Sequence, residues 1–400
     1  MLLYKYLTSP IKKELISKIS IYNELSRYNI IKKLIKEFLI NLLNLNNKLK
    51  FLNNIKFKFF KKKIIEYVQI WCWTQYSNPT IKDSVIPYVS NENYNFDVFL
   101  EALNYMLKTN LILDDIKDLI NNIKILLKKE YLIYIKKQDK IIIISKIIKK
   151  NNVILFCNYN NKSYNINIYK NLYNRLYKKY KITNKNTNNI DIYIYCLYFR
   201  YAYLDSENQQ LAIYIELKNS LKKLNINFEL FGSAINTLSD NYCSLFYDIE
   251  KFFGSSGNFF DIKLIEGIYW CNPPYINDLM YNTALKLINY IKSNKNIGFL
   301  VTIPIWDNIT QQIKLSNILK NNNINISNEY FKDYPIYYTL KPYIKYELII
   351  PKYKIPCFNF KRNKSIYAVD TYLLFIYDKL DSLYYNKIIN ELDIFYNKYL

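Results

Sequence analysis

The residues best suited to chemistry in this sequence are Asn272-Pro273-Pro274-Tyr275. An exocyclic adenine amine is planar, because its lone pair is delocalised into the ring. The side-chain carbonyl of Asn272 and the main-chain carbonyl of Pro273 can both accept hydrogen bonds from such an amine, which favours a pyramidal nitrogen able to attack a methyl sulfonium in line. Tyr275 offers a flat face for the base, and Pro274 holds the turn rigid. The tetrapeptide therefore predicts methylation of a planar nitrogen, with a simple turn after a strand as the alternative.

The tetrapeptide lies between two predicted elements. Residues 268–271 form an apolar run that ends at Pro-Pro, which is typical of a buried strand. Residues from about 278 to 291 have helical spacing. Since ligands bind at the carboxyl ends of strands in open α/β sheets, we expect the tetrapeptide to lie at a ligand-binding edge.

Strands and helices are predicted to alternate over the second half of the chain. The predicted strands are 228–231, 242–247, 268–271, 297–303, 346–350 and 371–377, and the predicted helices are 193–203, 209–224 and 308–319. This alternation indicates an α/β fold with a Rossmann-like, doubly wound sheet in a domain that spans residues 191–400. All five glycines lie between Gly232 and Gly298. Because glycine permits a close approach of the backbone, this clustering supports a small-molecule site there.

The predicted strand ends supply groups for S-adenosylmethionine in the order that a methyltransferase sheet uses them. The tight turn 231–236 is expected against the methionine part, and Asp248 or Glu250 is expected to bind the ribose hydroxyls. The loop 258–261 offers an aromatic wall and an acid to the adenine. The predicted cofactor contacts are Phe231, Gly232, Ser233, Asn236, Asp248, Phe260, Asp261 and Asn272.

Residues 1–190 are predicted to form a mainly α-helical domain on the substrate side. Lysine-rich amphipathic helices are expected over residues 1–70, where apolar residues recur at helical spacing. Residues 131–145 are predicted to form a small hairpin, and residues 181–189 a linker.

The charge balance indicates a polyanionic partner. Lys and Arg number 56 against 33 Asp and Glu, which gives a net charge of +23. Nucleic acid is the first expectation, although a biased composition rich in Lys, Asn, Ile and Tyr leaves part of this charge as solvated surface. Arginine makes bidentate phosphate contacts, so Arg27, Arg175 and Arg200 are candidate substrate contacts.

Several kinds of site are disfavoured by composition. The sequence contains no histidine, which excludes histidine-dependent triads, histidine-ligated zinc and imidazole acid–base catalysis. Its six cysteines show no close pair, so neither a metal site nor a disulfide framework is expected. We also expect no signal peptide and no membrane span, because lysines interrupt every long apolar run.

Further motifs accompany the tetrapeptide between residues 200 and 378. They are Arg200-Tyr201-Ala202, Asn208-Gln209-Gln210, Phe231-Gly232-Ser233-Ala234-Ile235-Asn236, Tyr242-Cys243-Ser244, Phe252-Phe253-Gly254-Ser255, Leu279-Met280, Ile303-Pro304-Ile305-Trp306 and the closing segment 367–377. With these motifs the chain resembles the phosphorylated-CTD-interacting factor family, the cap-specific adenosine N6-methyltransferases. The resemblance covers a little under half of the chain.

This resemblance implies a helical domain packed on a Rossmann-like class I methyltransferase domain, with the cap guanosine bound between the two domains. It implies transfer of a methyl group from S-adenosylmethionine to the 2′-O-methyladenosine next to the 7-methylguanosine cap of mRNA. Asn277 or Asp278 and Trp306 would then face the capped nucleotide, whose flat cation suits an aromatic side chain. A nuclear location is implied as well.

The sequence also departs from the family pattern. No WW domain is recognised before the core, so an interaction with the RNA polymerase tail is not expected. Ile305 stands where an acid is expected before Trp306. An adenine N6-methyltransferase acting on internal RNA or DNA sites, and an inactive relative that only binds RNA, are the alternatives.

Overall fold

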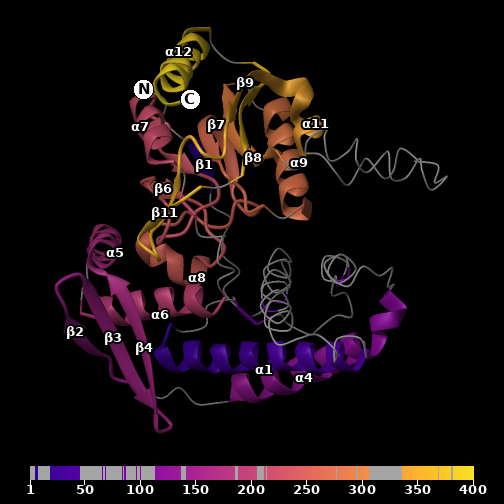
Figure 1. Cartoon of the computed structure of the whole chain (residues 1–400), viewed down its shortest axis with the longest axis vertical. Coiled ribbons are helices and arrows are strands. Elements are labelled where there is room, and N and C mark those ends of the chain that lie inside the picture. Colours follow the sequence, from indigo (N-terminus) through magenta and orange to yellow (C-terminus); the bar gives the residue numbers. More distant parts are fainter. Residues whose placement is uncertain are drawn as a thin grey trace. The chain divides into compact units, whose positions relative to one another are not determined.

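The computed structural model describes most of the chain in two compact units. The helical unit comprises Ile11–Tyr177 and Asn184–Asn208, and the sheet unit comprises Met1–Pro10, Lys178–Thr183 and Gln209–Leu400. Figure 1 labels the elements of both units. The described residues are 5–7, 19–45, 65, 68, 83, 85–86, 96, 100, 113–136, 141–184, 188–204, 211–212, 214–275, 277–293, 296–305, 336–367, 369–379 and 382–400.

The helical unit combines long helices with a small antiparallel sheet of strand order β2-β3-β4. Its described elements are α1 (Ile21–Leu45), α4 (Lys117–Lys136), β2 (Ser145–Ile148), β3 (Asn152–Tyr159), β4 (Lys162–Tyr169), the first part of α5 (Lys170–Thr183) and α6 (Ile190–Tyr203). The predicted amphipathic pattern of α1 buries Ile31, Leu34 and Phe38. The hairpin lies at β3–β4 rather than at 131–145, because residues 131–136 continue α4.

The prediction placed a domain boundary after residue 190, whereas α6 groups with the helical unit in this structure. Helix α6 belongs to that unit because it makes an ion pair and an aromatic contact with α1. The guanidinium group of Arg200 on α6 donates to the buried carboxylate of Glu24 on α1. The rings of Tyr28 and Phe199 from the same two helices lie 5.4 Å apart in an edge-to-face arrangement.

The sheet unit contains a mixed sheet whose described strands run in the order β6-β5-β7-β8-β12-β9. Strands β6, β5, β7 and β8 are parallel, and β12 runs antiparallel to both of its neighbours. A further short strand, β1, pairs antiparallel with β7. Their bounds are β1 (Lys5–Leu7), β5 (Phe228–Glu229), β6 (Asn241–Tyr242), β7 (Lys263–Cys271), β8 (Ile297–Pro304), β9 (Ile344–Ile350) and β12 (Thr371–Tyr377), with a separate pair formed by β10 (Cys357–Asn359) and β11 (Lys364–Ile366).

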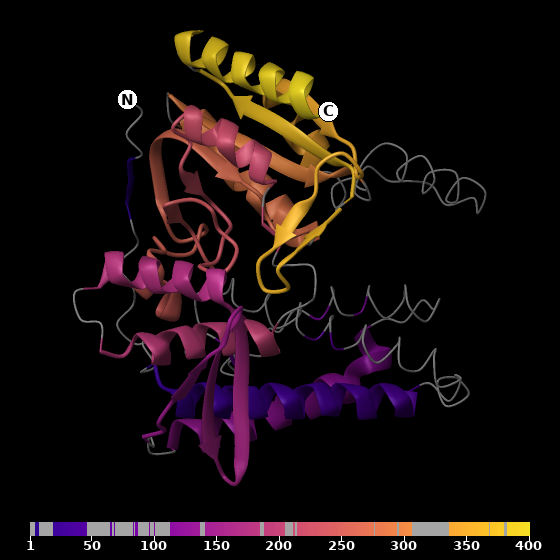
Figure 2. The ribbon, with the colours of Figure 1, turned by 60° about the vertical axis from the view of Figure 1, so that its left-hand side comes forward.

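Helices cover both faces of this sheet, so the predicted α/β class is confirmed. Helices α9 and α11 pack on one face, and α7 and α12 on the other (Figures 1 and 2). The helix predicted over 308–319 lies outside the described residues. The helix bounds are α7 (Ile215–Lys223), α8 (Tyr247–Glu250), α9 (Asn277–Ser293), α11 (Ile336–Leu340) and α12 (Ser382–Tyr399).

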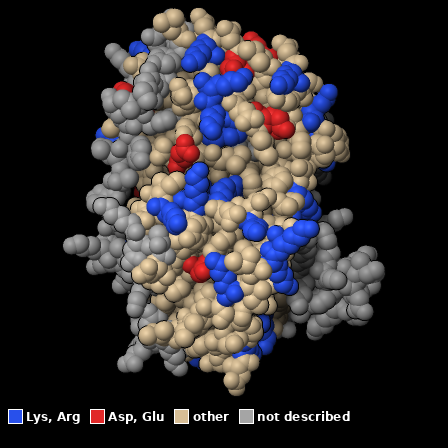
Figure 3. Space-filling model, turned by 90° about the vertical axis from the view of Figure 1, so that its left-hand side faces the viewer, with Lys and Arg blue, Asp and Glu red and all other residues tan. Residues whose placement is uncertain are grey.

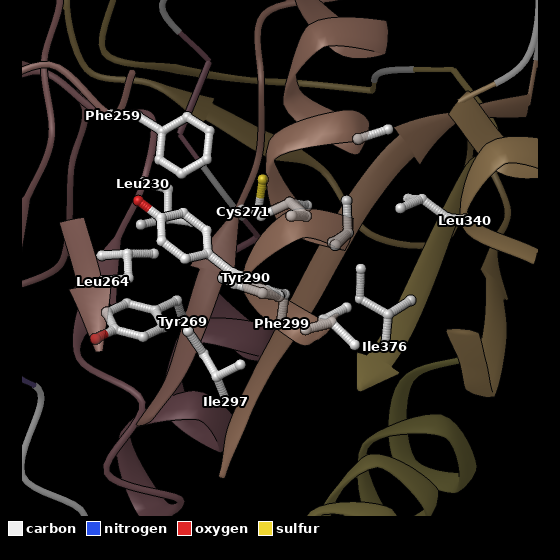
Figure 4. Packing of buried hydrophobic residues seen from close by; sticks show 14 of the residues in the cluster. Leu230, Phe259, Leu264, Tyr269, Cys271, Tyr290, Ile297, Phe299, Leu340 and Ile376 are labelled. Atoms are coloured by element: carbon white, nitrogen blue, oxygen red, sulfur yellow. The ribbon is translucent and has the colours of Figure 1, made fainter. Parts of the chain in front are cut away.

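Strict alternation along the strands divides the core of the sheet unit between these two faces. In β7, Tyr269 and Cys271 pack toward α9, whereas Ile268 and Trp270 pack toward α7 and α12. Figure 4 shows the α9 side, where Tyr290 from the helix lies over Tyr269 and Phe299 from the strands. Burial on both faces explains why the strand sequences read as continuous apolar runs.

The segment after residue 241 differs from its prediction. The predicted strand 242–247 is limited to β6 (Asn241–Tyr242), and the chain forms the short helix α8 from Tyr247. The side chain of Glu250 is the physical reason, because its buried carboxylate accepts hydrogen bonds from the Ala234 amide and the Tyr242 hydroxyl, which precede it in the chain. Such bonds require the backbone to turn back toward them.

No helix in the described part of the chain combines the length and the apolarity needed to cross a lipid bilayer.

Candidate cofactor and substrate site

The ends of β5 and β7 lie side by side at the carboxyl edge of the sheet. Glu229 pairs with Trp270 in the parallel register, and the amide of Leu230 donates to the Trp270 carbonyl at 2.8 Å. The turn after β5 and the tetrapeptide after β7 therefore leave the sheet next to each other. The strand order also reverses at β5, since β6 lies on one side and β7 on the other. This is the kind of switch point at which open α/β sheets bind ligands.

The turn after β5 is rigid and closely packed. The Ser233 amide donates to the Asn236 Oδ1 at 2.7 Å, and the Asn236 amide donates to the Ser233 Oγ at 3.2 Å. The Gly232 amide donates to the Cys243 carbonyl at 2.9 Å. A Cβ atom at Gly232 would approach the Thr237 Cβ to 3.2 Å, a tight contact. A glycine is therefore needed for packing at the position predicted to lie against the cofactor.

The two carboxylates considered for the ribose have different surroundings. Glu250 is fully buried, and its Oε2 accepts hydrogen bonds at 2.8 Å from the Ala234 amide and from the Tyr242 hydroxyl. Asp248, two residues earlier on α8, is only partly buried. The structure thus gives Glu250 a role in fixing the turn, and Asp248 stays the predicted ribose contact.

Three phenylalanines form an aromatic wall beside this turn. The ring centroid of Phe231 lies 5.1 Å from that of Phe259 and 6.1 Å from that of Phe260. Phe231 and Phe260, the two predicted to contact the cofactor, are partly buried, while Phe259 is buried in the core (Figure 4). The sequence predicts an aromatic wall in the loop 258–261, and Phe259 and Phe260 of that loop lie beside Phe231 from the turn. Their contact with an adenine stays a prediction.

Lys286 on α9 holds this aromatic loop, and sequence reasoning missed it. Its ammonium donates to the Phe259 carbonyl at 2.6 Å and to the Ile262 carbonyl at 3.2 Å, and lies 4.8 Å from the Phe259 ring centroid. Burial lowers the pKa of Lys286 to about 8, against the opposing effect of Asp261. Desolvation in turn raises the pKa of Asp261. One signal was available. Lys286 lies three residues after Thr283 and four before Tyr290, and this spacing places it on the same face of α9 as these two buried residues.

The tetrapeptide itself is anchored at Asn272. The Thr302 hydroxyl on β8 donates to the Asn272 Oδ1 at 2.7 Å. Pro273 is buried, and Pro274 and Tyr275 are partly buried. Burial raises the pKa of the Tyr275 phenol. Tyr275 therefore stays neutral and offers a ring face rather than a proton acceptor.

The predicted substrate residues near the tetrapeptide are described only in part. Asn277 and Asp278 form the first turn of α9, directly after the tetrapeptide, but their side chains lie outside the described residues. Trp306, one residue past Ile305, lies outside the described residues as well. Arg175 is partly buried on α5. The site residues thus remain predictions, with the cofactor-binding set and the tetrapeptide gathered at one edge of the sheet.

Arg27 and Arg200, predicted as substrate contacts, are instead fully buried within the helical unit. Arg27 pairs with Glu24 at 2.6 Å and with Asp83 at 2.9 Å. Arg200 pairs with the same Glu24, which also accepts a hydrogen bond from the Tyr203 hydroxyl at 3.0 Å. These guanidinium groups face buried carboxylates and have no exposed surface, so Arg200 links α6 to α1 and Arg27 links α1 to Asp83 rather than meeting a phosphate.

The described residues contain no group of three or more His, Cys, Asp or Glu side chains that could hold a metal ion. Their five cysteines are free and buried, at Cys157, Cys196, Cys243, Cys271 and Cys357.

Comparison with known proteins gives a consistent set of matches. A family model described as "Phosphorylated CTD interacting factor 1 WW domain" matches residues 169–333. Two curated relatives, from Homo sapiens and Mus musculus, are both called mRNA (2'-O-methyladenosine-N(6)-)-methyltransferase. Each is 28% identical to this chain over 121 residues, which are 28% of this chain and 17% of the relative. The matched segments therefore span less than a fifth of the length of these relatives.

The description of the family model corrects one expectation. It names a WW domain, which conflicts with the expectation that the chain has none, and that expectation is withdrawn. The matched residues run from the last residue of β4 through β5, β6, β7 and β8. They include the turn after β5 and the tetrapeptide after β7.

Proposed function

We propose that this chain, whose similarity to the phosphorylated-CTD-interacting factor family is established over residues 169–333, is an S-adenosylmethionine-dependent RNA adenine N6-methyltransferase. Its substrate in this proposal is the 2′-O-methyladenosine adjacent to the 7-methylguanosine cap of mRNA, the nucleotide named for the two relatives. By the same resemblance we propose a nuclear location, which fluorescence microscopy of the tagged chain tests.

The arrangement of the sheet supports a Rossmann-like class I methyltransferase fold. The parallel strands reverse their order at β5, and the antiparallel β12 is inserted between β8 and β9. Helices lie on both faces. In such a sheet the crevice beyond the ends of β5 and β7 is the favoured ligand site.

The residues at this crevice fit the proposed cofactor. The turn with Gly232 packs closely against Thr237, which keeps the backbone at the strand end where the cofactor is proposed to bind. The half-exposed rings of Phe231 and Phe260 suit a flat adenine, and Asp248 suits the ribose hydroxyls. S-adenosylmethionine, when bound, supplies an electrophilic methyl group.

The tetrapeptide supplies the orientation of the amine. The Oδ1 of Asn272 has two lone pairs, of which one accepts from Thr302, so that the other can accept from the adenine amine. The Pro273 carbonyl is the second acceptor, and the ring of Tyr275 receives the base. With its hydrogens held by these acceptors, the N6 lone pair points at the methyl group, and the excess proton leaves to solvent after transfer. No side chain has to act as a base.

The substrate end of the proposal depends on access and charge. A cap-adjacent adenosine is single-stranded and terminal, so it enters a site without the unstacking cost of a duplex base. Lys and Arg side chains predominate over Asp and Glu on the face shown in Figure 3, in keeping with an RNA partner. Trp306 is the aromatic residue that we propose to stack on the capped nucleotide, with Asn277, Asp278 and Arg175 as further contacts.

One observation carries this proposal, namely the hydrogen bond between Leu230 and Trp270 that sets the turn after β5 beside Asn272. The test is methyl transfer from labelled S-adenosylmethionine to RNA that begins with 7-methylguanosine-capped 2′-O-methyladenosine. The same RNA without a cap and an RNA with only internal adenosines serve as controls. We expect methylation of the capped RNA alone. Equal methylation of all three would replace the cap-specific function by an internal one, and no methylation with intact cofactor binding would refute the proposed reaction.

A further inference from the structure

The strand next to the tetrapeptide carries one polar side chain, and this side chain contacts Asn272. Strand β8 has the sequence IGFLVTIP, in which Thr302 is surrounded by apolar residues. Thr302 is 2% exposed, so its hydroxyl must find a partner within the protein. Cys271 pairs with Val301 in the parallel register, which brings the next residues, Asn272 and Thr302, opposite each other. The resulting hydrogen bond has a length of 2.7 Å.

This bond is made to the oxygen of the Asn272 amide. The terminal torsion of an asparagine is soft and roughly two-fold, so an unheld amide exposes either its oxygen or its nitrogen. In this structure the Thr302 hydroxyl donates to Oδ1, which corresponds to one of these two orientations. It also leaves the second lone pair of Oδ1 open to another donor. Thr302 thus holds an acceptor where the adenine amine requires one.

We propose that Thr302 is a positioning residue for the tetrapeptide. It orients the Asn272 amide, which acts on the amine in the chemical step. This inference rests on the proposed function and assigns one residue outside the tetrapeptide to it.

The experiment compares Thr302→Val with Thr302→Ser. Valine keeps the shape of threonine but lacks the hydroxyl, whereas serine keeps the hydroxyl. We expect valine to lower kcat by about 10- to 100-fold, the usual effect of removing a residue that orients a functional side chain. KM for capped RNA and the affinity for S-adenosylmethionine should change little. Serine should restore most of the lost kcat, which a purely structural role for the side chain would not predict.

The outcomes separate this inference from the proposed function. A wild-type protein that binds S-adenosylmethionine but methylates no RNA refutes the proposed function. An active wild type together with a folded Thr302→Val variant whose kcat is within twofold of wild type refutes the positioning role. If the valine variant does not fold, as judged by circular dichroism, Thr302→Ala is measured instead, and an unchanged kcat in that variant is equally contradictory.

Discussion

Two clusters of polar side chains in this protein show how similar residues serve different ends. In the helical unit, Glu24 is surrounded by Arg27, Arg200 and Tyr203, and every one of these side chains is buried. At the sheet edge, Asn272 is held by the Thr302 hydroxyl, and Asn272 and Tyr275 both stay partly exposed. The first cluster satisfies its charges internally. The second keeps one lone pair and one ring face for a substrate.

Residue type alone therefore does not distinguish a binding site from a structural cluster. Arginine is well suited to phosphate, and a chain with few arginines and a net charge of +23 makes each of them a candidate. A buried carboxylate is an equally good partner for arginine. Because Arg27 and Arg200 both pair with Glu24, their guanidinium groups have little capacity left to bind a phosphate. Exposure and spare hydrogen-bonding capacity are what mark the sheet edge as the site.

The strongest test of this comparison is Asn272→Ala. If the sheet edge is the reaction site, this change should lower the methylation rate by about two to four powers of ten, because it removes an oriented polar group. The affinity for S-adenosylmethionine should fall much less. Single-turnover methylation and calorimetric titration of the cofactor measure the two quantities. Near-normal turnover would remove Asn272 from the mechanism.

The helical cluster is tested by Arg27→Met. This change leaves Asp83 and part of Glu24 without their buried cation, so we expect a loss of about 3–5 kcal/mol in the free energy of unfolding. Denaturant unfolding measures this loss. Arg175→Met is the comparison variant, because Arg175 is partly exposed whereas Arg27 is fully buried, so its removal should lower stability less than that of Arg27 and should weaken RNA binding. A stable Arg27→Met protein with weakened RNA binding would reverse the roles assigned to the two clusters.

The packing of the cofactor turn is tested by Gly232→Ile. A side chain at this position would collide with Thr237 and press on Glu229 and Tyr242. Overpacking of this kind costs about 1–3 kcal/mol, which corresponds to a loss of about 10- to 100-fold or more in cofactor affinity if the turn is displaced. Isothermal titration checks this, with the melting temperature as a control for folding. Wild-type affinity would show that the turn does not contact the cofactor.

The smallest expected effect concerns the pH dependence of stability at Lys286. Its pKa is lowered from 10.5 to about 8 in the folded protein by burial, so the unfolded state binds more protons between these two values. The free energy of unfolding of the wild type relative to Lys286→Met should therefore rise as the pH increases from 8 to 10.5 and should level off below 8. Denaturant unfolding at several pH values measures this difference. A flat difference would indicate an ordinary, solvated lysine.

Local sequence signals were sufficient for the features that depend on neighbouring residues. The apolar run before Asn272 and the Pro-Pro that ends it are local signals, and β7 ends at Cys271 as they predict. The predicted alternation of strands and helices along the chain likewise placed β8, β9 and β12 close to their observed bounds. The hairpin at β3–β4 had a local signal that was overlooked, since Asn160 and Asn161 both adopt the left-handed conformation that a two-residue turn requires.

Contacts between side chains that are distant in the sequence follow from the folded structure and not from local patterns. Glu24 and Arg200 are separated by 176 positions, Asn272 and Thr302 by 30, and Lys286 and Phe259 by 27. No periodicity links such pairs, because each bond forms only after burial has removed water from both partners and left each needing the other. For the same reason, the sequence can indicate Asn272 as a hydrogen-bond acceptor but cannot indicate Thr302 as the donor that orients it.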